Sequence, residues 1–266
     1  MLNGVFRNQL MLGLAQAGLA AAAAIVVMLL ARRRQIHIER ETLIALIRGL
    51  AQIMIAGSIL VLLMRARRWT SIFILAAMTI AAAATSARRA KRIPGAFQVS
   101  LYAIAAGAGS VIALMSIAGA IDMAITAMVP VGSMLIANAM NTNGLALDRF
   151  RSDVQAHVGQ IEAGLALGAA PAQTVAPYVQ AAYRASLIPA IDNLRSLGIV
   201  WIPGLMAGMV LSGSPPLYAA VYQFVVLAMI FAASGLTCLI STILIRERAF
   251  SPAEQLLLRP GAAAGQ

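Results

Sequence analysis

Long stretches without a charged side chain constrain this chain more than any other feature of its sequence. Three of them cover residues 93–121, 123–147 and 196–245. Each exceeds the roughly 20 apolar residues that a helix needs to cross a lipid bilayer. Charged residues make up 11% of the chain, whereas an ordinary soluble domain carries roughly a quarter. The composition therefore excludes a soluble enzyme and indicates a membrane protein with several spans.

The apolar runs are continuous rather than alternating in polarity, which predicts helices and not strands. Short basic links and the turn signal at residues 212–216 separate one run from the next. We expect an all-α fold and a single transmembrane domain over residues 1–266. It would have about seven spans, at about residues 10–31, 43–64, 69–86, 99–120 and 123–141, a sixth that ends near Leu211, and a seventh at about 217–245.

The distribution of Lys and Arg predicts how the chain is oriented. If the N-terminus lies outside and the C-terminus inside, fourteen basic residues fall in inner segments and four in outer ones. Positive charge is enriched on the cytoplasmic side of membrane proteins, so this orientation is favoured. The same reasoning assigns the net charge of +11 to anionic lipid headgroups and not to nucleic acid. We expect a multi-pass protein of the cytoplasmic membrane.

The longest polar segment, at about residues 147–185, is predicted to be a cytoplasmic loop. Its pattern suggests a short amphipathic helix, then Gly168, then a new helix that starts near Pro171. Such a knob suits docking to another protein. The pattern fits equally well a helix that lies on the lipid surface.

Part of this loop resembles the cytoplasmic EAA loop of ATP-binding-cassette (ABC) importer permeases, through Glu162, Ala163 and the glycine six residues after the glutamate. In that family the short helix of the loop sits in a groove of the ATPase subunit. The resemblance implies that Glu162, Ala163, Gly168 and Pro171 couple this chain to an ATPase.

A second resemblance covers nearly the whole chain. The segments PVGSMLIANAM at residues 130–140, LIPAID at 187–192 and PGLMAG at 203–208 are similar to the FetB-type permease family. That family comprises bacterial permeases associated with iron export and plant aluminium-tolerance permeases, each working with a separately encoded ATPase. The resemblance implies a permease subunit that exports iron or another metal ion. We also expect a homodimer, because two permease chains facing each other would let two ATPase subunits close on ATP between them.

The sequence has no G-x-x-x-x-G-K-[ST] phosphate loop, so we expect a non-catalytic subunit without a cofactor of its own, and ATP–Mg in the partner ATPase. Two alternatives stay open. One is an autonomous secondary transporter or channel, and the other is an ABC exporter of an organic solute such as a nucleotide sugar.

Candidate residues for a translocation path fall in the predicted fifth and sixth spans. Thioethers could bind a soft metal ion, while amide oxygens suit harder ions. Plain packing explains any single methionine more simply, and an interhelical hydrogen bond explains the asparagines. The candidates are Pro130, Met134, Asn138, Met140, Asn141, Pro203 and Met206, and the metal ligands stay unknown.

Three charged residues lie close to the ends of the predicted spans. Asp192 and Arg195 are three residues apart, so they can pair on one face of a helix. Arg48 lies a turn or two inside the second predicted span. We interpret all three as structural, with a gate as the alternative. The single cysteine, Cys238, is expected to be a small buried apolar residue.

Overall fold

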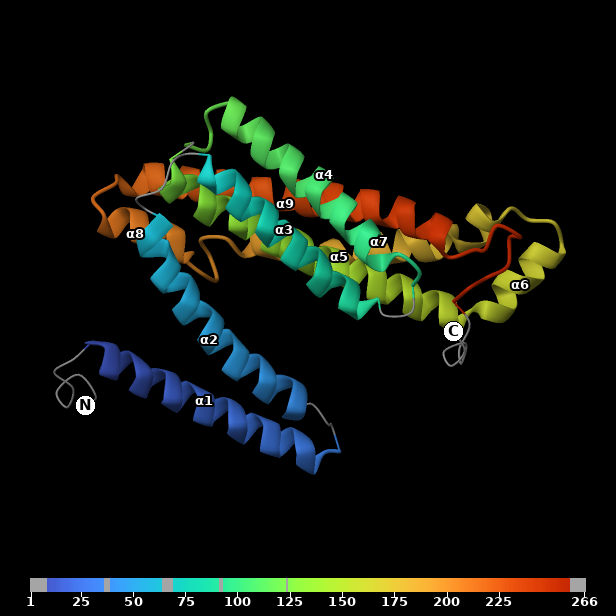
Figure 1. Ribbon diagram of the computed structural model, residues 1–266, viewed down its shortest axis with the longest axis horizontal. Coiled ribbons are helices and arrows are strands. Elements are labelled where there is room, and N and C mark those ends of the chain that lie inside the picture. The colour runs from blue at the N-terminus through green and yellow to red at the C-terminus, as the bar shows by residue number, and fades with distance from the viewer. Residues whose placement is uncertain (1–8, 36–38, 64–68, 91–92, 123, 259–266) are drawn as a thin grey trace. The chain divides into compact units, whose positions relative to one another are not determined.

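The computed structural model describes residues 9–35, 39–63, 69–90, 93–122 and 124–258. Within these residues the chain is helical, apart from turns and two isolated β-bridges, so the all-α prediction is confirmed (Figure 1). The helices are α1 (Gln9–Arg33), α2 (Glu39–Leu63), α3 (Thr70–Arg89), α4 (Ala96–Ile117), α5 (Ile125–Ala156), α6 (Val158–Ala166), α7 (Pro171–Ser196), α8 (Gly204–Leu211) and α9 (Pro216–Arg248).

The contacts divide the chain into two compact units, Met1–Ala66 and Arg67–Gln266. In the first unit, α1 and α2 pack against each other as a hairpin. Most of their described side chains are apolar and exposed, including Leu19, Ile47 and Ile53. A surface of this kind suits lipid rather than water.

The second unit is a bundle of α3, α4, α5, α7 and α9 with two hydrophobic cores. Core 1 contains Leu75 of α3, Ile112 of α4 and Val226 of α9. Core 2 contains Val99 of α4 and Ile245 of α9. The order of these residues along each helix shows that α3 and α9 run from core 1 to core 2, whereas α4 runs back.

Helix α5 follows α3 and α9 in direction, because Leu135 packs in core 1 and Leu147 in core 2. Helix α7 runs back, because Val175 near its start is buried in core 2 and Leu194 near its end packs against core 1. Helices of the bundle that follow one another along the sequence therefore alternate in direction, and the connection through α6 lies at the core 2 end.

A glycine allows a close contact between two helices of the bundle. A Cβ atom on Gly107 of α4 would lie 2.7 Å from the Cα atom of Thr237 on α9. Only a residue without a side chain lets the two backbones approach so closely. This contact therefore sets how closely α4 packs against α9.

Two predicted segments differ in the structure. The segment that ends near Leu211 is α8, whose eight residues extend about 12 Å and cannot cross a hydrocarbon layer of about 30 Å. The segment at 147–185 contains more helix than expected: α5 continues to Ala156, and the helix expected to start near Pro171 runs to Ser196.

Four described helices are long and apolar enough to cross a membrane, namely α3, α4, α9 and the part of α1 from Met11 to Arg33. Helix α2 contributes a shorter apolar stretch, Thr42–Ser58. The multi-pass membrane class is thus confirmed. The count of seven spans and the orientation stay predictions, as does the single domain over residues 1–266.

Candidate functional site

A helical knob forms at the core 2 end of the bundle, where the sequence predicts a coupling element. Helix α6 ends at Ala166, and Gly168 follows with a φ of 87°. Pro171 occupies the first turn of α7, where its missing N–H removes no hydrogen bond. The predicted short helix, glycine turn and new helix at Pro171 are all confirmed.

Contacts between α6 and α7 hold the knob together. Ile161 and Val175 are buried side chains of core 2. A Cβ atom on Gly164 would lie 3.1 Å from Cγ2 of Thr174, so the two helices approach closely there. The Tyr178 hydroxyl donates a hydrogen bond of 3.3 Å to the side-chain oxygen of Gln160. The knob is therefore a packed structure and not a loose loop.

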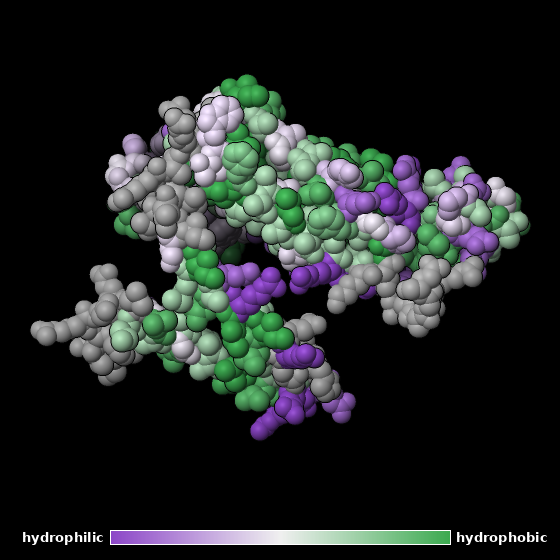
Figure 2. Space-filling model, viewed as in Figure 1, coloured by the Kyte–Doolittle hydropathy of each residue, from purple (hydrophilic) through white to green (hydrophobic). Residues whose placement is uncertain are grey.

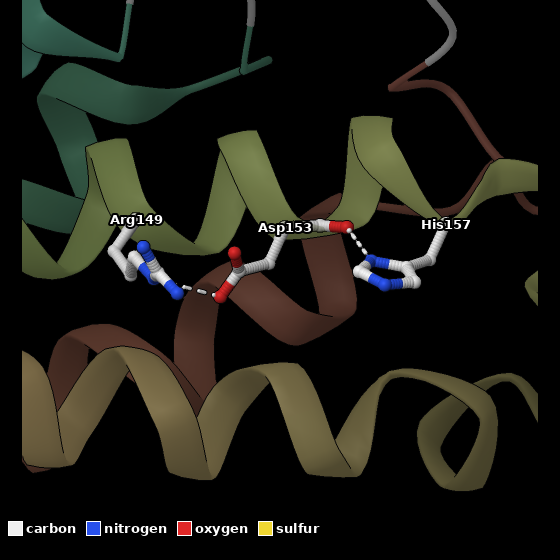
Figure 3. Close-up of polar contacts among 3 residues, drawn as sticks. All are labelled: Arg149, Asp153 and His157. Atoms are coloured by element: carbon white, nitrogen blue, oxygen red, sulfur yellow. Dashed lines mark hydrogen bonds and ion pairs between the residues drawn. The ribbon is translucent and has the colours of Figure 1, made fainter.

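The last turns of α5 carry polar side chains into the knob (Figure 3). The guanidinium of Arg149 lies 3.0 Å from the carboxylate of Asp153, one turn along the helix. The Nδ1–H of His157 donates to the backbone oxygen of Asp153 at 2.8 Å. The His157 ring stacks on Tyr178 of α7, with centroids 5.0 Å apart. The junction between α5 and α6 is thus tied to α7.

The chain after α9 folds back onto the knob as a hook, residues 249–258. Leu256 and Leu258 are buried in core 2, and Leu257 N–H donates to Ala249 O at 2.9 Å. The hook and the knob together enclose an open pocket of about 620 Å³. Its described lining includes Glu162, Gly168, Pro171, Glu254 and Gln255.

Three of the four predicted coupling residues, Glu162, Gly168 and Pro171, therefore line one pocket. Sequence reasoning missed two features here. The hook carries no motif that reveals its position, and Leu167 is 89% exposed at the tip of the knob. The sequence signal that could have found Leu167 is its place directly before the glycine of a predicted turn.

The predicted path residues do not share one environment. Met134 and Met140 pack against core 1, and the amide of Asn138 donates to the backbone oxygen of Met134 in its own helix, at 2.8 Å. Asn141 is exposed on α5. The remaining three are Pro130, which is exposed on α5, Pro203, which is buried just before α8, and Met206, which is half-buried in α8.

The buried amide of α5 is Asn143, which sequence reasoning did not select. Its side-chain nitrogen donates to Ser86 of α3 at 2.7 Å and to Ser100 of α4 at 2.9 Å. All three residues are buried, and the cluster ties three helices together. Its only sequence signal is a third polar position in the segment NTN at residues 141–143.

The predicted ion pair exists, but it is exposed. Nη1 of Arg195 lies 3.8 Å from the Asp192 carboxylate, and the two side chains are 78% and 61% exposed. Arg48 is exposed on α2 in the first unit. Within the described part of the chain, no three His, Cys, Asp or Glu residues come together as a metal site.

The bundle, its apolar helices and the knob at its polar end define a multi-pass, all-helical membrane protein (Figure 2). The model described as "Uncharacterised protein family (UPF0014)" matches residues 14–250, and the chain belongs to this family. This confirms the resemblance found in the sequence.

Individual relatives agree with this assignment. The chain is 29% identical to the UPF0014 membrane protein STAR2 of Oryza sativa, over 94% of this chain and 88% of the relative. It is 28% identical to the UPF0014 membrane protein YjkA of Bacillus subtilis, over 82% of this chain and 88% of the relative. It is 31% identical to the probable iron export permease protein FetB of Escherichia coli, over 49% of this chain and 51% of the relative.

The chain thus spans about half the length of FetB. The relatives' names describe membrane proteins and a permease, which fits a role other than catalysis. No solved structure matches the chain.

Proposed function

We propose that this chain is the permease subunit of an ABC transporter in the cytoplasmic membrane, where it works as a homodimer with a separate ATPase subunit. The C-terminus and the knob face the cytoplasm. The main support for this proposal is the knob, because it is a packed, polar protrusion, joined rigidly to the bundle, on which an ATPase subunit could act. Glu162, Ala163, Gly168 and Pro171 form the part that meets the ATPase.

Helix continuity supports this mechanism. Helices α5 and α7 both extend from the knob into the bundle, where α7 packs against α5 and α9. A force on the knob would therefore reach the bundle through two helices without crossing a flexible link. To bias two states of the bundle, the ATPase needs differential contacts of a few kcal/mol.

The proposed cargo is a metal ion. It rests on the name of FetB, a probable iron export permease. Export of an organic solute, and transport without any ATPase, are the competing functions.

Gly168 provides the first test of coupling. The chain would be purified with a candidate ABC ATPase subunit, and ATP hydrolysis would be measured in proteoliposomes with and without the permease. We expect Gly168→Ala to reduce stimulated hydrolysis severalfold, because alanine at a φ of 87° costs about 1–2 kcal/mol and reshapes the turn.

The matched control is Gly159→Ala in α6. No atom lies within 4 Å of a Cβ at this position and its backbone is helical, so the variant should stimulate hydrolysis like the wild type. If no ATPase co-purifies, or if Gly168→Ala stimulates fully, the coupling role of the knob is contradicted.

A further inference from the structure

Helix α7 presents a polar face that is not covered within the second unit. Gln180, Arg184, Asp192 and Arg195 are all exposed, and their spacing places them on one side of the helix. The opposite side holds the buried residues of α7, among them Ala182 and Ser186. The exposed set, together with Gln173, is called the α7 polar face here.

This face lies beside a membrane-spanning candidate. The Ser186 hydroxyl lies 3.0 Å from the Cys238 sulfur, ten residues before the end of the apolar helix α9. Arg184 is two residues from Ser186 and therefore within about 3 Å of the same depth. Asp192 lies six residues after Ser186, and thus about 9 Å nearer the core 1 end. The charges thus stand alongside α9 and not beyond its ends.

Lipid is an unsuitable neighbour for such a face. Placing an Arg or Asp side chain in the hydrocarbon centre is unfavourable even on insertion scales. In contrast, the exposed side of α9 at the same depth is apolar and carries Leu236, Leu239 and Ile243. Charged residues inside a membrane generally face a water-filled cavity or a partner with matching charge.

We infer that the α7 polar face lines a water-filled translocation path, and that Arg184 selects for solutes that carry negative charge. The inference rests on the proposed transport function. Among the charged residues of the face, two are guanidinium groups and one is a carboxylate, and Asp192 already lies near Arg195. Arg184 is left as a cation in the path. It attracts an anionic solute, such as a metal ion chelated by carboxylates or phosphates, and repels a bare divalent cation.

Cysteine accessibility tests the path. Ala181→Cys and Ile188→Cys, at exposed positions on the same side of α7 as the α7 polar face, would each be placed in a Cys238→Ser background and treated in vesicles with a membrane-impermeant methanethiosulfonate. Both should react at least about tenfold faster than a thiol in an apolar environment, because only the thiolate reacts and burial in an apolar environment suppresses it.

Leu239→Cys in the same background is the matched control. Leu239 is 46% exposed and next in sequence to Cys238, so it lies at nearly the depth of Ser186, but on the apolar side of α9. If Ala181→Cys and Ile188→Cys react as slowly as Leu239→Cys, the face meets lipid or protein, and the inference is wrong.

The charge of the path is tested with two reagents at Ile188→Cys, one turn from Arg184. The ratio of the rates of a sulfonate reagent and a trimethylammonium reagent should exceed the ratio for a free thiol in solution. Arg184→Gln should lower it up to about thirtyfold, because about 1 kcal/mol between charges 4 Å apart in water speeds the anionic reagent about fivefold and slows the cationic reagent about fivefold. An unchanged ratio would show that Arg184 does not select solutes by their charge.

These results are independent of the knob experiment. Labelled path positions with no ATPase coupling would support the path and contradict the ABC mechanism. Coupling through Gly168 with unreactive α7 positions would support the ABC mechanism and contradict the path.

Discussion

At the scale of single residues, the buried amide of Asn143 illustrates how a polar group can specify helix packing in an apolar bundle. Its nitrogen donates to the hydroxyls of Ser86 and Ser100, so one side chain ties α5 to both α3 and α4. In a bilayer the alternative to such bonds is an unsatisfied polar group, which the surroundings cannot solvate.

Replacing Asn143 should therefore destabilise the bundle. Asn143→Ala removes both hydrogen bonds and leaves a cavity, so we expect a loss of about 1–2 kcal/mol. Thermal unfolding in detergent would measure it, with Asn141→Ala, which changes an exposed amide two residues away, as the control. Equal melting temperatures for the two variants would show that the hydrogen bonds of Asn143 contribute nothing to the stability of the bundle.

The sequence pointed to the correct type of residue here but to the wrong positions. Asn138 and Asn141 were selected because they are three apart and share a face. Which face of an apolar helix turns inward depends on its neighbours, and the chain offers little polarity contrast to reveal it. The structure turns Thr142 and Asn143 inward instead.

At the scale of helices, the contact between α4 and α9 depends on the missing side chain of Gly107. Gly107→Ala would bring a methyl group within 2.7 Å of the Thr237 backbone, and the helices must separate. We expect a destabilisation of about 1–3 kcal/mol. It would be measured as a lower midpoint of thermal inactivation.

Gly109→Ala is the control, since no atom lies within 4 Å of a Cβ at that position of the same helix. The variant should be neutral or slightly more stable, because alanine favours the helix. A loss of stability at Gly109 as large as that at Gly107 would mean that the glycines matter for another reason.

Helix ends were harder to predict than the membrane class. The sixth span was placed by absence of charge, which identified α8 and its flanks. It missed that the helix starting at Pro171 packs into the bundle, because Arg184, Asp192 and Arg195 make α7 polar. In contrast, Gly168 and Pro171 marked their boundary correctly, since each has a local conformational preference that does not depend on distant contacts.

At the scale of the whole molecule, the second unit has two different ends. The knob, the hook and the basic ends of α3 and α9 lie together near core 2, whereas α8 lies near core 1 and is apolar. Figure 2 shows hydrophilic side chains gathered towards the α6 end of this unit. This asymmetry is the structural basis for the proposed orientation.

Two exposed leucines test that orientation. Leu167 on the knob and Leu211 at the end of α8 are 89% and 88% exposed. In intact cells an impermeant maleimide should label Leu211→Cys and not Leu167→Cys, and permeabilisation should make both reactive. Labelling of Leu167→Cys alone before permeabilisation would place the knob outside and reverse the proposed topology.

Helix α5 has a mechanical consequence. Its 32 residues, with Pro130 in the second turn, extend about 48 Å. A tilt of only about 10° about one end would therefore carry the other end sideways by about 8 Å. Such leverage would let a small stroke below the bilayer open or shut a passage near its far surface, without any helix having to unfold.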